Sequence, residues 1–164
     1  MSYAARADRP ADKAELYAEL HDEILAVLDG EPDRIARMAT MSSMLADAFP
    51  AFIWTGFYLV DATKGDELVV GPYQGTLGCL RIAFGRGVCG AAAAERRTQL
   101  VEDVHAFPGH IACDGRSTSE IVVPVADADG RLIAVLDIDS DQFAAFDQTD
   151  ATALERLVKS VFTV

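Results

Sequence analysis

Three cysteines are the residues of this chain best suited to chemistry. Cys79, Cys89 and Cys113 each stand beside a glycine or a polar turn, and none lies inside an apolar run. Three thiols cannot all pair with one another, and residues 1–10 carry charged side chains without an apolar export segment. We therefore expect a cytoplasmic protein with thiols reduced at rest, in which a disulfide would be transient and catalytic or sensory.

Three carboxyl groups form a second candidate constellation. Residues 120–126 and 131–139 read as the two strands of a hairpin. A four-residue loop would place Glu120 opposite Asp137, and a two-residue turn would place it opposite Asp139; both registers put the three acids on one face. If that face is covered, at least one pKa rises and the cluster needs a cation such as a ligand ammonium. A loop of odd length would place Glu120 on the opposite face of the sheet from Asp137 and Asp139. If the shared face were open to solvent, the three acids would be ordinary surface charges.

An aromatic pair forms a third candidate. Trp54, Gly56 and Tyr58 alternate within residues 52–60, which are aromatic and branched and predict a strand. Alternation places the three on one face, with an aromatic-walled gap over the glycine that suits a small apolar or sulfonium-like group. Aromatic side chains at this spacing also simply fill cores, so the pattern alone leaves both readings open.

Metal binding and hydrolase chemistry have less support. His105, His110 and Cys113 lie close together in the sequence, but the cysteines form no C-x-x-C pair of the kind that structural zinc sites use. No serine stands in a nucleophile-elbow context. We therefore expect no metal and no cofactor.

Composition limits the function classes further. The chain has 164 residues, of which 51% are hydrophobic, and this is enough for one domain with one core. Its net charge of −12 repels nucleic acid and anionic lipid. No apolar run approaches the roughly 20 residues that cross a bilayer. Small molecules and other proteins are the expected partners.

Periodicity and turn signals predict a mixed α and β chain with antiparallel strands. The predicted elements are helices over 12–28 and from Pro32 to Pro50, strands over 52–60, 67–70 and 80–84, a short helix over the alanine run ending near Arg97, a long loop over 104–119, the hairpin strands, and a last helix from Asp147 to about Phe162. Cys89 would lie near the N-terminus of the short helix, where the helix dipole lowers a thiol pKa.

Six stretches of the sequence resemble the GAF-domain free methionine-(R)-sulfoxide reductases. They are Trp-Thr-Gly-Phe-Tyr at 54–58, Gly-Pro-Tyr-Gln-Gly at 71–75, Gly-Arg-Gly-Val-Cys-Gly at 85–90, His-Ala-Phe-Pro-Gly-His-Ile-Ala-Cys-Asp at 105–114, Ser-Glu-Ile-Val-Val-Pro at 119–124 and Leu-Asp-Ile-Asp-Ser at 136–140. Together they span about residues 15–160. One departure is Ile53, where the family pattern has a polar residue, and it touches no reactive role.

The resemblance implies an α+β fold of the GAF type. Its central antiparallel sheet would have about six strands, with the N-terminal helices and the C-terminal helix packed on one face. A single GAF domain over residues 13–164 would follow an N-terminal extension over residues 1–12. The two amphipathic N-terminal helices would form the surface of a homodimer.

The resemblance also implies roles for the cysteines and the aromatic pair. Cys113 would be the nucleophile, with Cys79 the resolving thiol and Cys89 a second candidate for that task. Trp54 and Tyr58 would wall the methyl-sulfoxide end of the substrate.

The acids would hold the substrate ammonium and assist protonation. Glu120 is the first candidate for the proton donor, and Asp137 and Asp139 are alternatives. A thiolate attacks a sulfoxide only if the oxygen is protonated as it leaves, so an acid must lie beside the thiol.

The implied reaction reduces free L-methionine-(R)-S-oxide to L-methionine. Attack would leave a sulfenic acid on the nucleophile, which a second cysteine would convert to an intramolecular disulfide. Thioredoxin would be the partner that reduces this disulfide. The alternative is a GAF-type sensor that binds a small ligand or senses oxidation without turnover.

Overall fold

The fold is a six-stranded antiparallel sheet with helices on both faces. The computed structural model describes residues 9–111 and 113–163. The elements are α1 (Lys13–Val27), α2 (Arg34–Ala48), β1 (Trp54–Val60), β2 (Glu67–Gly75), β3 (Arg81–Ala83), α3 (Gly87–Glu95), β4 (Gln99–Val101), the 3-10 turn η1 (Val104–Ala106), β5 (Ser119–Ala126), β6 (Leu132–Ser140) and α4 (Gln148–Phe162). The strands are ordered β3-β2-β1-β6-β5-β4. This confirms the expected GAF-type α+β fold.

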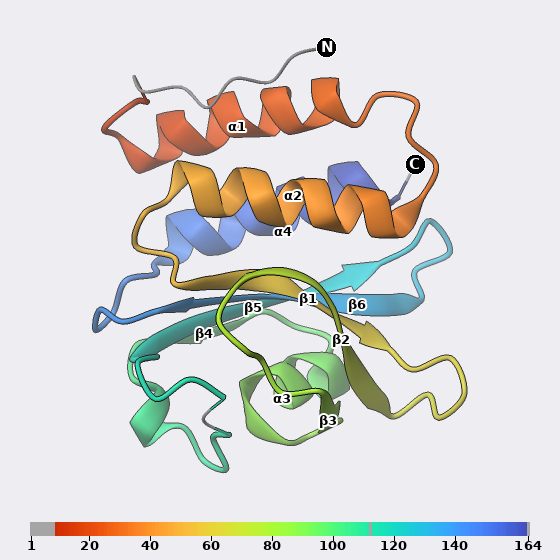
Figure 1. Ribbon diagram of the computed structural model, residues 1–164, viewed down its shortest axis with the longest axis vertical. Helices are drawn as coiled ribbons and strands as arrows, with labels where there is room; N and C mark the ends of the chain where they lie inside the picture. Colours follow the sequence, from red (N-terminus) through yellow and green to blue (C-terminus); the bar gives the residue numbers. More distant parts are fainter. Residues whose placement is uncertain (1–8, 112, 164) are drawn as a thin grey trace.

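The helices form two layers on one face of the sheet. Figure 1 shows α2 and α4 lying directly over the strands, with α1 outside them and α3 on the opposite face. We expected both N-terminal helices to pack on the sheet. The helices α1, α2 and α4 all lie on the predicted face, but α1 packs mainly on α2 and α4, so it forms a second, outer layer. Within the described residues, no helix is both long and apolar enough to cross a membrane.

Capping residues set the helix boundaries. The Asp12 carboxylate accepts a hydrogen bond from the Glu15 amide, as the sequence predicted. The second helix starts later than Pro32, because Asp33 caps it through the Ala36 amide. Asp147 starts α4 with a reciprocal capping box. The starts of α1, α2 and α4 therefore follow from side chains that satisfy free backbone N–H groups.

The hairpin has the register predicted for a two-residue turn, but its connection is longer than two residues. Glu120 lies opposite Asp139, as expected for a two-residue turn. The connection, however, is the odd segment 127–131, which the Asp127 amide closes by donating to the Arg131 carbonyl at 2.9 Å. A register shift next to Ala126 absorbs the extra residue. This irregularity keeps the acids on one face.

Two apolar clusters flank the sheet. The larger joins the helical layer to inward-facing strand residues such as Phe57 and Leu136. The smaller, on the α3 side, contains Trp54, Tyr58 and Cys89. Strand alternation therefore sends Phe57 to one face and the predicted aromatic pair to the other. The second face is the one that carries the candidate residues.

Candidate active site

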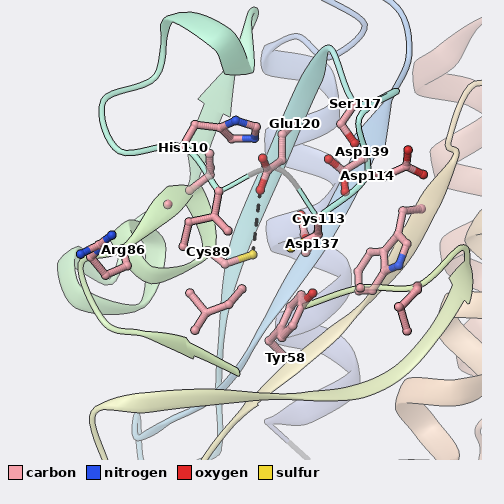
Figure 2. Close-up of a pocket in the computed structure, with 17 residues that line it drawn as sticks. Tyr58, Arg86, Cys89, His110, Cys113, Asp114, Ser117, Glu120, Asp137 and Asp139 are labelled. Carbon is pink, nitrogen blue, oxygen red and sulfur yellow. Dashed lines mark hydrogen bonds between the residues drawn. The ribbon is translucent and has the colours of Figure 1, made fainter. Parts of the chain in front are cut away.

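A small cavity on the α3 side of the sheet gathers the predicted residues. Its volume is about 40 Å³. Figure 2 shows the side chains that line it, contributed by β1, α3, β5, β6 and the segment around Cys113. The predicted residues among them are Trp54, Tyr58, Cys89, Cys113, Glu120, Asp137 and Asp139. Cys79 does not line the cavity but is bonded to a residue that does.

The three acids share this cavity, and the pKa of each is raised, mainly by burial. Glu120 and Asp137 are 6% and 5% exposed, and burial followed by the neighbouring carboxylates raises both pKa values well above normal. Burial also raises the pKa of Asp139 to about 6, against a hydrogen bond from Ser117 that lowers it. At least one carboxyl therefore carries a proton near neutrality. Ser117 was not predicted, because no sequence pattern links it to the hairpin.

Cys89 lies in the first turn of α3, as predicted, but its pKa moves the other way. Its side chain is buried, and Sγ donates to Glu120 Oε1 at 3.9 Å. Burial, and then the charges of Asp137 and Glu120, raise the thiol pKa well above normal. The prediction of a thiol made acidic by the helix dipole was therefore wrong. Desolvation and two nearby carboxyl groups outweigh the dipole.

Cys79 and Cys113 form a disulfide with a Cα–Cα distance of 5.4 Å. The bridge joins two loops that are far apart in sequence. Polar contacts tie the same loops together: Thr76 donates to an Asp114 oxygen at 2.6 Å, and Arg116 pairs with Asp114 at 2.7 Å. The predicted nucleophile is thus at the cavity and already bonded to the predicted resolving thiol.

The aromatic wall differs from the prediction in one respect. The Trp54 and Tyr58 rings stack with centroids 5.5 Å apart, and Trp54 also stacks on Tyr73 at 5.0 Å. The expected gap over Gly56 does not exist, because a Cβ there would lie 2.2 Å from the Tyr73 Cβ. Tyr73 belongs to the Gly-Pro-Tyr-Gln-Gly stretch and was missed, because the predicted second strand ended at residue 70.

The histidines do not build a metal site with Cys113. The His105 and His110 ring centroids are 6.4 Å apart, and Cys113 is in the disulfide. Among the described residues, these three side chains do not form a group that could hold an ion. His110 lines the cavity. Burial lowers its pKa, so the imidazole is neutral near pH 7.

Comparison with known proteins identifies the family. A family model described as a GAF domain matches residues 39–161. The chain is 45% identical over 147 residues to the free methionine-R-sulfoxide reductase of Escherichia coli strain K12, covering 90% of this chain and 87% of that protein. It is 39% identical over 154 residues to the free methionine-R-sulfoxide reductase of Saccharomyces cerevisiae, covering 92% of this chain and 86% of that protein.

A solved structure agrees with this assignment. The free methionine-R-sulfoxide reductase of Neisseria meningitidis, in complex with its substrate, superposes with a TM-score of 0.89 at 50% identity, covering 96% of this chain and 93% of that one. The family match over residues 39–161 includes all the cavity residues, and these relatives each cover at least 90% of the chain. The chain therefore belongs to the GAF-domain family, within the group of free methionine-R-sulfoxide reductases.

Proposed function

We propose that this protein reduces free L-methionine-(R)-S-oxide to L-methionine, with Cys113 as the nucleophile. The observation that carries the proposal is the shared cavity: Cys113, three acids with raised pKa values and the Trp54–Tyr58 wall line the same 40 Å³ space. A sulfoxide needs a thiolate and a proton donor together. Its apolar methyl group fits an aromatic wall, and its ammonium fits the acids.

The first step transfers one oxygen atom. The Cys113 thiolate attacks the sulfoxide sulfur while Glu120 protonates the departing oxygen. The attack joins Cys113 Sγ to the substrate sulfur in an adduct that carries the protonated oxygen as a hydroxyl group. This hydroxyl then passes to Cys113 Sγ as the bond between the two sulfur atoms and the substrate sulfur–oxygen bond break, so methionine leaves reduced and Cys113 becomes a sulfenic acid. Glu120 is suited to this role because its burial keeps a proton available near neutral pH. Asp137 and Asp139 then hold the ammonium, and Asp139, the less buried acid, is the alternative donor.

In the second step, the Cys79 thiol condenses with the sulfenic acid, releasing water and forming the disulfide. The Cys79–Cys113 bond supports Cys79 as the resolving cysteine. Cys89 is poorly suited to this role, since its raised pKa keeps it protonated and therefore a weak nucleophile. Cys89 is thus assigned no covalent step.

An external dithiol must then return both cysteines to thiols, and we assign this role to thioredoxin. The disulfide is accessible to it, because Cys113 is exposed and Cys79 partly so. Leu80, next to Cys79, is 70% exposed and offers an apolar contact beside the bond to be reduced. A protein that works by this cycle needs a reducing cytoplasmic location.

The disulfide form is too tight for substrate. A cavity of about 40 Å³ holds only a few water molecules, far less than an amino acid requires. The bridge joins the loops that border this cavity. Reduction must therefore precede binding of the next substrate, and the enzyme alternates between a reduced binding state and an oxidised closed state.

Turnover tests the proposal directly. Purified protein with dithiothreitol should consume free methionine-(R)-sulfoxide, and Cys113→Ser should not. Mass spectrometry of protein treated with substrate but no reductant should find the Cys79–Cys113 disulfide. Binding of the sulfoxide without turnover would instead establish the sensor alternative.

Two further expectations belong to the same proposal. Residues 13–164 form one GAF domain after an extension over 1–12, of which residues 1–8 lie outside the described residues. The domain forms a homodimer through α1 and α2, on the side of the sheet away from the cavity. Light scattering in solution measures the dimer, and a monomer at micromolar concentration would contradict it.

A further inference from the structure

The proposed cycle leaves one thiol without a role. Cys89 Sγ lies 3.9 Å from Glu120 Oε1, and ligand atoms of Cys89, Glu120 and Asp137 all lie within 4.8 Å of one another. The three side chains are at most 6% exposed. Figure 2 shows Cys89 directed toward Glu120 at the cavity. A buried thiol between two carboxyl groups is a ligand set for a cation, irrespective of its place in catalysis.

A second observation points to a missing ligand at the same place. Asp137 Oδ1 is fully buried and has no hydrogen-bond partner among the described residues. Burying a carboxylate oxygen without a hydrogen bond destabilises the folded protein, so we expect such an oxygen to have a functional role. Asp137 lines the cavity together with Cys89 and Glu120, and one of its carboxylate oxygens lies within 4.8 Å of the ligand atoms of both.

The distances suit zinc better than other common divalent cations. Zinc bonds thiolate at about 2.3 Å and carboxylate at about 2.0–2.2 Å, so a tetrahedral site places its ligand atoms about 3.3–3.7 Å apart. The observed 3.9 Å between Cys89 and Glu120 is within a small side-chain adjustment of that range. Magnesium and calcium take oxygen ligands only and leave the thiol unused. Three protein ligands leave the fourth position of the metal to water.

From this arrangement we propose that Cys89, Glu120 and Asp137 form a zinc site inside the cavity. Binding displaces the thiol proton and any carboxyl proton, forms one Zn–S and two Zn–O bonds, and changes no oxidation state. The zinc site is inferred from these three residues and does not depend on the proposed function. A consequence rests on the proposed function: zinc occupies the carboxylates that hold the substrate ammonium, so zinc and substrate exclude each other.

Cadmium is the probe for the site, because its bond to thiolate gives an ultraviolet charge-transfer band. The experiment uses the Cys79–Cys113 disulfide form, in which Cys89 is the only free thiol of the three cysteines in the chain. One equivalent of Cd²⁺ should produce the band. Zn²⁺ should displace Cd²⁺ from the site and thereby remove the band. Cys89→Ser should abolish it.

Carboxylate variants keep the test valid if Cys89→Ser fails to fold. Asp137→Asn and Glu120→Gln retain the thiol and should each weaken Cd²⁺ binding at least about 10-fold. Asp129→Asn, which changes an exposed acid on the hairpin loop, is the matched control and should bind normally. No band in the disulfide form, or equal affinity in Asp137→Asn, would overturn the site.

Competition is measured separately. The Cys79→Ser/Cys113→Ser double variant keeps the proposed metal ligands and cannot turn over. Trp54, the one tryptophan of the chain, reports sulfoxide binding to it by fluorescence. Adding Zn²⁺ should raise the apparent dissociation constant for sulfoxide at least about 10-fold, and no change would refute exclusion. Metal binding without any sulfoxide binding would contradict the proposed function and leave the zinc site standing.

Discussion

Replacing Asp139 with asparagine should stabilise the protein at neutral pH while harming its chemistry. The pKa of Asp139 is raised from 3.8 to about 6, mainly by burial. At 1.36 kcal/mol per pKa unit this difference corresponds to about 3 kcal/mol of unfolding free energy when the carboxylate is ionised. Because solvent reaches this partly buried side chain, we expect Asp139→Asn to gain about 1–3 kcal/mol.

The sign of the pH dependence follows from where the proton is held. Below about pH 4 the carboxyl is protonated in both the folded and the unfolded protein, so wild type and Asp139→Asn should have equal stability. Between about pH 4 and 6 the unfolded chain ionises first, and wild-type stability falls relative to the variant. Above about pH 7 the difference should be constant.

Urea unfolding at pH 4, 5, 6 and 8, with both proteins in the disulfide form, measures this difference. Asp129→Asn is the control, since its exposed carboxylate should give a difference near zero at every pH. The interpretation that burial in the cavity raises the pKa of Asp139 would be refuted by either of two results. Asp139→Asn could be no more stable than wild type at pH 8, or its gain in stability over wild type could increase toward low pH.

Four shorter predictions concern the cycle itself. Glu120→Gln should lower kcat by about 10²–10⁴-fold, because glutamine cannot donate the carboxyl proton; an unchanged kcat would exclude Glu120 as the donor. Cys79→Ser should keep its first turnover, measured as a methionine burst, and lose the steady state supported by thioredoxin; retention of that steady state would exclude Cys79 as the resolving thiol. Leu80→Ser should raise the KM for thioredoxin without altering turnover with dithiothreitol. The control is Phe143→Ser, which changes a side chain that is 65% exposed elsewhere on the surface and should alter neither quantity. Equal effects of the two variants would exclude a specific contact between Leu80 and thioredoxin. Trp54 fluorescence should respond to methionine in reduced protein only, and a response of the disulfide form would show that its cavity is open.

The hairpin shows how far sequence reasoning reaches and where it ends. Alternating acids and branched residues were enough to place Glu120, Asp137 and Asp139 on one face. The connection, however, has odd length, and parity is restored by an irregularity at the base of the hairpin. Such bulges carry no clear composition signal in this hairpin. The prediction was therefore correct about the face and wrong about the turn.

Contacts between distant segments explain the other differences. The strand β4 has three residues and depends on pairing with β5, so its local sequence gives little signal. Tyr73 fills the space over Gly56 because β2 continues past residue 70 and bends against β1. Local patterns identify helices and the alternation of strands, whereas a side chain supplied by another strand can be found only once the pairing is known.

Cys89 illustrates the same limit in electrostatics. Its position in a helix N-terminus predicted an acidic thiol, because a dipole argument considers only the thiol's own element. In the folded protein the thiol is buried beside Glu120 and Asp137, and burial, followed by the charges of these two groups, raises its pKa. The same environment that makes Cys89 a poor nucleophile makes it a good partner for a cation.

The acids, the thiol and the aromatic wall can therefore be understood through one requirement. Two buried carboxyl groups and a partly buried third destabilise each other when no cation is present. A proton, a substrate ammonium or a metal ion would each relieve this repulsion, and each would have a consequence for function. A retained proton supplies the acid that a departing oxygen needs. In the proposed function, a substrate ammonium would neutralise the carboxylates and place the sulfoxide against Trp54. A thiophilic metal would neutralise the same groups and recruit Cys89. Since all three use the same oxygens, Asp137→Asn should weaken them together: it removes a ligand of the metal, a charge that would hold the ammonium, and a charge that raises the pKa of Glu120.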